Sequence, residues 1–441
     1  MQLLILLIDF KKAFDTIDWS FLFKSLKKFK FKECFIKLVN VMYSNITSVI
    51  SNNGWISEPF NIKRGIRQGC PLSALLFVIV AEVLAVKIRS SNMVEGIQIR
   101  TENQTHTIKI CQLADDTTLF LKNQHEITAS LHIIEEYGIF SGLQLNRNKT
   151  EGLWLGRLRN IDLNMENITF TNTFIKTLGV YFGHDHELCS RLNWEVKLNQ
   201  IKEQFKKWGN AKSYLFWKKN IVIKSVLLPK VIYIIQNTFN SKKYLNTLNS
   251  LFFKFLWSNK SEKIKRKTLI GKKLNGGLDM IDIHTFSKSL KVKWIKNLRD
   301  STLANWKVIP KLYLDQFGKN LLIFDMNIDS FKSLPKPILK LSTFHKELIN
   351  IWIEMRPLID KTKPKTFYDI RQQVIWGNKY IKLKGKCLVY KHWIDSNIVY
   401  VNDLLSDDGS ICELIILTKL NKTQNWIIEY LRLKKLFPKH G

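Results

Sequence analysis

The sequence predicts an α+β fold for the first part of the chain and a mainly α-helical fold for the rest. Up to about residue 185, short apolar runs alternate with helical patterns and turn signals. From 197 to 296 the pattern is mainly helical, and 23 Lys or Arg residues stand against four acidic residues. Beyond about 300 the helical pattern returns, broken by LPKPIL and KTKPKTF. These shifts predict three domains, 1–185, 186–300 and 301–441.

The composition indicates a folded, strongly basic protein. A hydrophobic content of 45%, with 12% aromatic residues, argues against disorder. The chain has 69 Lys and Arg against 37 Asp and Glu, a formal charge of +32, which favours a polyanionic partner. Nucleic acid is the favoured partner, because neutralising many phosphates releases their counterions. An anionic membrane surface is the alternative.

No segment of the sequence predicts a membrane span. The most apolar stretch, from Leu72 to Val86, is 15 residues long and contains Glu82, whereas a bilayer core needs about 20 apolar residues. We expect a buried helix there, with Pro71 in its first turn. The six cysteines form no CxxC pair, which favours reduced thiols in an intracellular protein.

A pair of acidic residues interrupts a strand-like run. In QLADDTTLFL, Asp115 and Asp116 lie between IKICQLA and TTLFLK, which predicts the tip of a tight hairpin. Asp407 and Asp408 differ, because the Gly that follows them favours a simple turn. Two carboxylates at a hairpin tip stay ionised most easily with a divalent cation between them and a third carboxylate.

That third carboxylate is expected at Asp9. QLLILLID opens the chain with a continuous apolar run, which is typical of a central strand buried on both faces. Asp9, then Asp15 in an AFD triplet, then the acidic hairpin about 100 residues later form an ordered series. The series predicts that carboxylates distant in sequence meet at one end of a sheet.

A Gly-rich turn, RGIRQGCPLSALLF, lies between these acidic residues. Gly65 and Gly69 allow the backbone to approach a ligand closely, while Arg67 and Gln68 can hydrogen-bond a nucleotide. A long apolar helix starts directly afterwards, and the N-terminus of a helix favours phosphate. The turn is therefore a candidate nucleotide-binding element.

With these motifs in this order, the chain resembles the reverse transcriptase of non-LTR (LINE-type) retrotransposons. DFKKAFD at 9–15 resembles the family's first palm motif, RQGCPLS at 67–73 its second and LADD at 113–116 its third. GLQLNRNKTE at 142–151 resembles the fourth motif, and TLGVYFG at 177–183 the primer-grip motif. The resemblance continues more loosely to about residue 300, and WIDSNIVYVNDLL still looks similar.

The resemblance implies a fold and a reaction. The fold would be a right-hand polymerase palm, an antiparallel sheet with packed helices, lacking most of the fingers and followed by a thumb-like helical region and a C-terminal helical region. The reaction would be RNA-directed DNA polymerisation with two Mg²⁺ ions, or Mn²⁺ as an alternative. Asp9 and Asp115 would be the main metal ligands, with Asp116 beside them. Leu113 departs from the Tyr or Phe that is common before this Asp pair.

The resemblance also implies roles around the incoming deoxynucleoside triphosphate. Phe14 matches the aromatic steric gate that collides with a ribose 2′-hydroxyl, although the alternative is an ordinary core Phe. Arg67, Gln68 and Gly69 would form the nucleotide pocket. Lys149 matches the lysine of the fourth motif, which would protonate pyrophosphate, and a solvated surface lysine is the alternative.

The template and primer would be held elsewhere. By the same resemblance, Leu178, Gly179 and Val180 would position the primer end. The basic region from 197 to 296 would be the thumb and its extension, which would grip the RNA template and DNA primer by phosphate contacts.

Two alternatives stay open. The family has a fingers region before its first palm motif and usually an endonuclease further upstream, and this chain starts eight residues before Asp9. We therefore expect the chain as given to extend primers poorly, and a catalytically inactive nucleic-acid-binding remnant is one alternative. An RNA-dependent RNA polymerase or an intron maturase is the other, although Phe14 and RQGCPLS argue against the former. A retroelement protein would be found in the nucleus or the cytoplasm.

Overall fold

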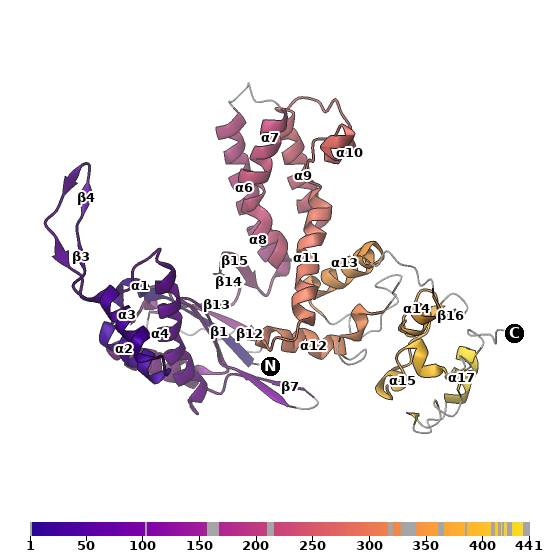
Figure 1. Cartoon of the computed structure of the whole chain (residues 1–441), viewed down its shortest axis with the longest axis horizontal. Helices are drawn as coiled ribbons and strands as arrows, with labels where there is room; N and C mark the ends of the chain where they lie inside the picture. Colours follow the sequence, from indigo (N-terminus) through magenta and orange to yellow (C-terminus); the bar gives the residue numbers. More distant parts are fainter. Residues whose placement is uncertain are drawn as a thin grey trace. The chain divides into compact units, whose positions relative to one another are not determined.

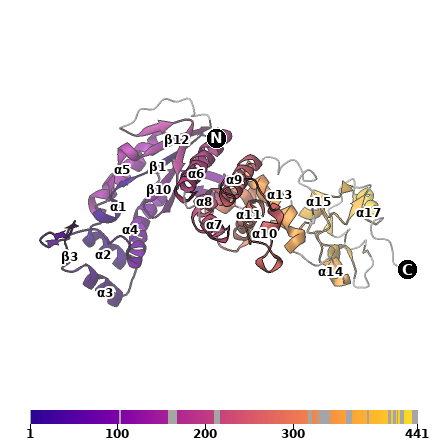
Figure 2. The same ribbon diagram turned by 90° about the horizontal axis from the view of Figure 1, so that it is seen from above.

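The computed structural model divides by internal contacts into two compact units, Met1–Asn193 and Trp194–Gly441, and Figures 1 and 2 show their elements. Mixed helix and sheet content confirms the predicted α+β class, whereas the three-domain division stays a prediction. The structure describes residues 2–101, 104–156, 167–209, 216–315, 321–326, 328, 341–359, 366–383, 386–406, 411–412, 416, 419–420 and 426–434.

A five-stranded sheet organises the first unit, in the order β13-β12-β1-β10-β9. The central strand β1 (Gln2–Ile8) runs antiparallel to β10 (Asp116–Leu121) and to β12 (Glu151–Gly156). On the outside, β9 (Ile110–Leu113) is antiparallel to β10, whereas β13 (Thr169–Thr171) is parallel to β12. The opening apolar run is therefore the central strand, as predicted.

The prediction that this strand is buried on both faces is only partly right. Leu4, Leu6 and Ile8 on one face are at most 4% exposed. Ile5 and Leu7, on the other face, are half-buried. A sheet with mainly antiparallel strands can have one face covered by helices and the other partly open. An apolar side chain is tolerated at a half-buried position, so the sequence run did not reveal the difference.

Helices α2 (Trp19–Lys28), α4 (Pro71–Ser90) and α5 (Gln124–Ser141) share a hydrophobic core with the buried face of β1. The helix predicted from Leu72 is confirmed as α4, with Pro71 as its first residue and an end four residues beyond Val86. Among the described helices, α4 alone has the length and apolarity that a membrane-spanning helix would need. One side of α4 lies in the core.

Between α2 and α4 lie α3 (Glu33–Tyr43) and an extended arm, which projects away from the helices in Figure 1. The arm is built from short paired strands, and Trp55 near its tip is 82% exposed. The remaining elements of this unit are β2 (Phe10–Lys11), α1 (Ala13–Thr16), β3 (Thr47–Ser48), β4 (Ser51–Asn52), β5 (Trp55–Ile56), β6 (Phe60–Asn61), β7 (Ile97–Arg100), β8 (Thr105–Ile108), β11 (Gln144–Leu145), η1 (Arg147–Lys149), β14 (Phe174–Thr177) and β15 (Val180–Gly183).

The second unit is mainly helical and has two hydrophobic cores. The first core is formed by α6 (His186–Gly209), which begins in the first unit, α7 (Phe216–Val222), the π-helical turn η3 (Ile223–Leu227), α8 (Pro229–Asn237), α9 (Lys242–Leu256), α10 (Arg266–Ile270) and the start of α11 (Ile283–Arg299). The short turn η4 (Lys273–Asn275) follows α10 and has no buried residue. The second core is formed by the end of α11 with α12 (Val308–Leu314), η7 (Leu322–Phe324), α13 (Thr343–Ile359), α15 (Lys391–Asp395), η10 (Val401–Leu404) and α17 (Trp426–Lys434). The other elements of this part of the chain are η5 (Asn305–Lys307), α14 (Phe367–Arg371), β16 (Lys382–Leu383) and β17 (Lys386–Cys387).

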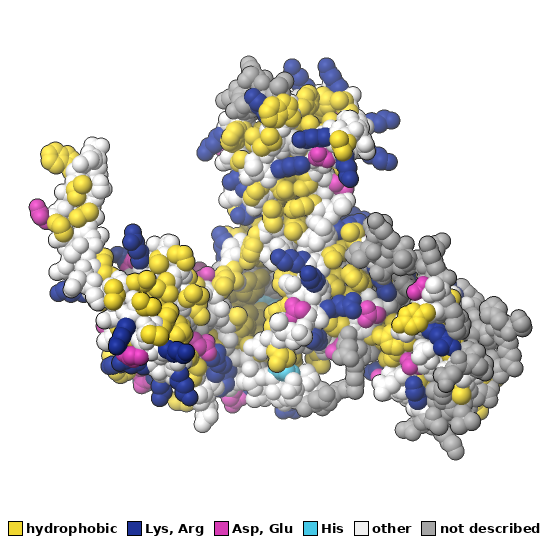
Figure 3. All heavy atoms as spheres, in the orientation of Figure 1, with side chains coloured by type: hydrophobic (Ala, Val, Ile, Leu, Met, Phe, Trp, Pro, Cys, Tyr) yellow, Lys and Arg dark blue, Asp and Glu magenta, His cyan; other side chains and the backbone are white. Residues whose placement is uncertain are grey.

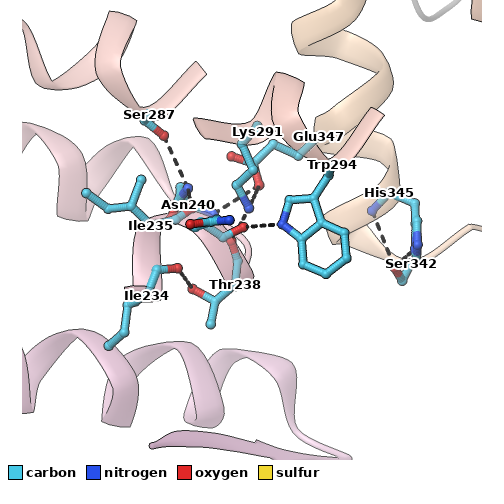
Figure 4. A network of polar contacts seen from close by, with 11 residues as sticks. Ile234, Ile235, Thr238, Asn240, Ser287, Lys291, Trp294, Ser342, His345 and Glu347 are labelled. Carbon is cyan, nitrogen blue, oxygen red and sulfur yellow. Dashed lines mark hydrogen bonds and ion pairs between the residues drawn. The ribbon is translucent and has the colours of Figure 1, made fainter. Parts of the chain in front are cut away.

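A buried polar network joins the two cores of the second unit (Figure 4). Lys291 of α11 has no exposed side-chain surface and forms an ion pair with Glu347 of α13 at 3.3 Å. Its ammonium group also donates to the carbonyl oxygen of Thr238, just after α8. The backbone N–H of Asn240 donates to Glu347 at 3.2 Å. Each charged group thus has hydrogen-bonding partners, as a buried ion pair requires.

Candidate active site

Asp9 and the acidic pair lie at the same end of the two neighbouring strands β1 and β10. Ile8 of β1 pairs with Thr117 of β10, so the next residue of each strand in this register is Asp9 opposite Asp116. The pairing of Leu113 with Asp116 leaves a two-residue hairpin tip that includes Asp115. The hairpin predicted from the sequence is therefore present, and it brings the pair beside the end of the central strand.

The carboxylates of this site influence one another. The pKa of Asp116 is raised by partial burial, and further by the charges of Asp115 and Asp9. A carboxylate whose charged form is disfavoured by two like charges gains from a nearby cation. The site therefore has the electrostatic character of a cation site.

The donor set suits a hard cation. Asp9, Asp115 and Asp116 offer only oxygen, and Mg²⁺ is commonly held by one or two carboxylates together with water and substrate phosphates. Across the described ranges, no group of three or more His, Cys, Asp and Glu side chains is already arranged as a metal site. The residues fit Mg²⁺ as partial ligands, with substrate and water completing its coordination.

Two residues that the sequence did not single out hold Asp9 in place. Nδ2 of Asn146 donates to Oδ2 of Asp9 at 2.7 Å, and the backbone N–H of Asn146 donates to the Asp9 carbonyl oxygen at 2.8 Å. The backbone N–H of Asp9 lies 3.4 Å from the hydroxyl oxygen of Thr150, which accepts from it. Both residues lie within GLQLNRNKTE, so the fourth motif is the sequence feature that could have indicated their role beside Asp9.

The Gly-rich turn is fastened to α1 by backbone contacts. The N–H of Gly65 donates to the carbonyl oxygen of Ile17, and the N–H of Ile66 donates to that of Phe14, both at 2.7 Å. A Cβ atom on Gly65 would lie 2.7 Å from the Asp15 carbonyl oxygen, so this approach requires glycine.

These backbone contacts hold the second motif, RQGCPLS, beside the first motif, DFKKAFD. Nε2 of Gln68 donates to Oδ1 of Asp15 at 3.4 Å. Arg67, Gln68 and Gly69 are exposed at the start of α4. Hydrogen bonds from the backbone N–H groups of Ser73 and Leu72 lower the pKa of the Cys70 thiol. The start of α4 therefore favours negative charge, which suits a phosphate group.

Phe14 lies at the edge of the core rather than deep within it. Its side chain is half-buried, and its ring stacks on that of Phe77 in α4, with centroids 4.6 Å apart and an interplanar angle of 14°. The contact fixes the ring plane. The steric-gate role stays a prediction.

The other predicted residues occupy separate turns. Lys149 is exposed at the end of η1. Leu178 and Gly179, with φ of 47° and 79°, form the two-residue turn between β14 and β15, and Val180 opens β15. Among the described contacts, none joins Lys149 or the turn at 178–179 to the three carboxylates.

Comparison with known proteins shows what the first unit is similar to. Residues 2–182 match the family described as reverse transcriptase (RNA-dependent DNA polymerase). An uncharacterised 149 kDa protein of transposon TX1 from Xenopus laevis is 24% identical over 264 residues, 59% of this chain and 20% of that protein. The retrovirus-related Pol polyprotein of the type-2 retrotransposable element R2DM from Drosophila melanogaster is 27% identical over 142 residues.

That second match covers 32% of this chain and 13% of the Drosophila protein, so the chain spans about a fifth or less of the length of these two relatives. Among solved structures, a telomerase from Candida tropicalis in complex with a telomeric RNA fragment gives a TM-score of 0.35 at 14% identity. The match covers 71% of this chain and 49% of that chain. A TM-score of that size does not establish a common fold.

Proposed function

We propose that residues 2–182, a reverse transcriptase domain of the non-LTR retrotransposon type, catalyse nucleotidyl transfer onto a DNA primer along an RNA template. The observation that carries the proposal is the juxtaposition of Asp9 with Asp115 and Asp116 across β1 and β10. The five-stranded sheet and its covering helices act as the palm of a polymerase.

The carboxylates would hold the metal ions of the reaction. Asp9 and Asp115 would be the main ligands of two Mg²⁺ ions, or of Mn²⁺ in their place, with Asp116 beside them. Bound there, such ions would supply activation of the attacking hydroxyl and neutralisation of the charge on the triphosphate and its leaving group. Asn146 keeps the Asp9 carboxylate directed towards them through its hydrogen bond to Oδ2.

The start of α4 receives the incoming deoxynucleoside triphosphate. Arg67, Gln68 and the backbone at Gly69 contact it, and the contact of Gln68 with Asp15 fixes the Gln68 side chain. Phe14, whose ring is held against Phe77, acts as the steric gate that excludes a ribose 2′-hydroxyl.

Other parts of the chain position the nucleic acid and the proton. Lys149 donates a proton to the departing pyrophosphate. The turn at Leu178, Gly179 and Val180 positions the primer end. The basic region from 197 to 296 grips the template and primer through their phosphates.

Single-nucleotide primer extension tests this function. The 441-residue chain would be incubated with an RNA template, an annealed DNA primer, deoxynucleoside triphosphates and Mg²⁺. We expect slow, Mg²⁺-dependent incorporation that is lost in Asp115→Asn and retained in Glu58→Gln, a matched change at an exposed carboxylate of the arm. RNA binding without any incorporation would identify the inactive nucleic-acid-binding remnant. Incorporation that survives Asp115→Asn would contradict the assigned site.

A further inference from the structure

One end of the helical bundle in the second unit combines many lysines with exposed aromatic rings. The segment Ser258–Gly276, here called the basic loop, contains α10 and η4. It holds one Arg, one Glu and six exposed lysines, which are Lys260, Lys263, Lys265, Lys267, Lys272 and Lys273. Figure 3 shows Lys and Arg side chains gathered around this end of the bundle, where α7 and α10 are labelled in Figure 1.

The basic loop is held in place by buried side chains of α7. The ammonium group of Lys219, which is 7% exposed, donates to the Leu256 carbonyl oxygen at 3.5 Å and to the hydroxyl oxygen of Ser258. Nδ2 of Asn220 donates to the Leu278 carbonyl oxygen at 2.7 Å. These contacts fasten both ends of the loop to one helix.

Contacts within the loop fix its fold further. Leu269 is buried, and its carbonyl oxygen accepts from the N–H groups of Leu278 and Met280, both at 3.0 Å. A Cβ atom on Gly277 would lie 2.0 Å from the Gly271 carbonyl oxygen, so the two backbones cross closely. The lysines therefore project from a folded surface rather than from a solvated tail.

The positive charge of the loop is not neutralised by neighbouring acids. Its one acidic residue, Glu262, accepts hydrogen bonds from Nε of Arg266 at 2.9 and 3.1 Å. Among the carboxylates that the structure describes, none forms an ion pair with the six lysines. The loop therefore presents a concentrated positive surface, which favours an anionic partner.

Aromatic rings border this surface. Phe216 and Trp217 open α7 and are 42% and 49% exposed. The Phe216 ring contacts that of buried Trp257, directly before the basic loop, with centroids 4.7 Å apart. Together with the contact of Lys219 with Ser258, this places the start of α7 beside the start of the loop. Trp217 lies at that end of α7, and Nζ of Lys218 is 5.5 Å from its ring centroid.

We propose that this surface, Trp217 with the basic loop, binds single-stranded RNA, with the lysines on successive phosphates and an unpaired base stacked on Trp217. Lysines that follow a backbone beside an exposed aromatic ring are the usual elements of single-strand binding. A duplex keeps its bases stacked on one another, so the indole ring favours an unpaired strand. The inference deepens the grip proposed above for the 197–296 region, and rests on that function in taking RNA as the polyanion.

Fluorescence anisotropy with a labelled single-stranded RNA of about 20 nucleotides tests the proposal. Trp217→Leu should weaken binding of this RNA by roughly tenfold and binding of a duplex of equal length far less. The triple variant Lys265→Gln, Lys267→Gln, Lys272→Gln should lower the slope of log affinity against log salt by about 2, because each single-strand phosphate contact contributes about 0.7.

Matched variants in the first unit control for general effects. Trp55→Leu removes another exposed indole, and a triple change at exposed lysines of α2, Lys24→Gln, Lys27→Gln, Lys28→Gln, removes the same charge. Both should leave the affinity for single-stranded RNA within about twofold of wild type.

Three results would overturn the proposal. The first is that Trp217→Leu binds single-stranded RNA as well as Trp55→Leu does. The second is that the two lysine triples weaken RNA binding equally. The third is that vesicles of phosphatidylserine and phosphatidylcholine capture the chain through Trp217 in preference to RNA. Primer extension by the same proteins separates the two claims. If wild type binds RNA but does not extend the primer, the result would count against the polymerase function alone.

Discussion

The side-chain amide of Asn146 donates to Oδ2 of Asp9 at 2.7 Å, across 137 positions of sequence. Together with the backbone bond from Asn146 to the Asp9 carbonyl oxygen, this contact fixes both the position and the rotation of the Asp9 carboxyl group. One carboxylate oxygen thereby has a hydrogen-bond partner, and in the proposed site the other oxygen would bind a metal ion. Groups that orient a metal ligand in this way affect metal binding without touching the metal.

Asn146→Ala should therefore weaken Mn²⁺ binding by about 10- to 100-fold, because Asp9 loses the partner that orients it. Isothermal titration calorimetry with Mn²⁺ would measure the effect. Asn148→Ala, two residues away on the exposed side of η1, is the matched control and should bind as wild type. Equal Mn²⁺ affinity in the two variants would show that Asn146 supports the turn only.

Leu178→Asn should raise the free energy of unfolding by about 1 kcal/mol. Leu178 has a φ of 47° and is 44% exposed, and a left-handed conformation costs a Leu roughly 1–2 kcal/mol, whereas Asn-Gly is favoured in such a turn. Urea denaturation would measure the change. Leu274→Asn, at an almost fully exposed position without a positive φ, should change stability by less than about 0.5 kcal/mol. A destabilised Leu178→Asn would mean that Leu178 makes a contact worth more than its strain.

Phe14→Val should raise the ratio of ribonucleotide to deoxynucleotide incorporation, because the ring stacked on Phe77 is replaced by a smaller side chain. Single-nucleotide incorporation with each substrate would give the ratio. Phe14→Tyr keeps the ring and should keep the wild-type ratio. If Phe14→Val leaves the ratio unchanged, Phe14 is only a packing residue.

Lys291→Met should lower the free energy of unfolding by about 3–5 kcal/mol, because Glu347 would keep a buried carboxylate without its partner. The double variant Lys291→Met, Glu347→Leu should recover much of this loss. Lys288→Met, which removes a partner of exposed Glu354, should cost at most about 1 kcal/mol. A double variant as unstable as Lys291→Met would contradict the account of the pair in Figure 4.

The same pair should make stability depend on pH. Burial lowers the pKa of Lys291 from 10.5 to about 8. Between these values the unfolded chain holds a proton that the folded protein has lost, so this group's contribution to stability rises with pH. Burial raises the pKa of Glu347 above its ordinary value of 4.5. The contribution of Glu347 to stability therefore falls as pH rises from 4.5 through its pKa in the folded protein. Relative to the double variant, wild type should therefore gain stability from about pH 8 to 10, and a flat difference would contradict the lowered pKa of Lys291.

Local patterns were enough to predict the elements that carry the acidic residues. The apolar run before Asp9 became the central strand, and the strand-like runs around Asp115 became a hairpin. The interpretation of the second acidic pair, Asp407 and Asp408, concerns residues outside the described ranges. One-sided burial of β1 was missed because half-buried positions also accept apolar side chains.

Contacts between distant segments could not be predicted. The bonds from Asn146 to Asp9 and from Gln68 to Asp15 depend on how turns from different motifs pack, which spacing along the chain does not determine. In the sequence, Lys291 is one of 23 Lys or Arg residues of a basic region, and only the packing of α11 against α13 makes it a buried ion-pair partner.

Mn²⁺ binding followed by electron paramagnetic resonance tests the central claim most directly, namely that Asp9 and Asp115 jointly hold the catalytic metal ions. Titrations would be run on wild type, Asp9→Asn, Asp115→Asn and Glu58→Gln, each with template, primer and a deoxynucleoside triphosphate present. We expect bound Mn²⁺ in wild type and Glu58→Gln, and its loss in both Asp variants, since removing one carboxylate removes a ligand from the shared site. Equal Mn²⁺ binding by all four proteins would contradict the account.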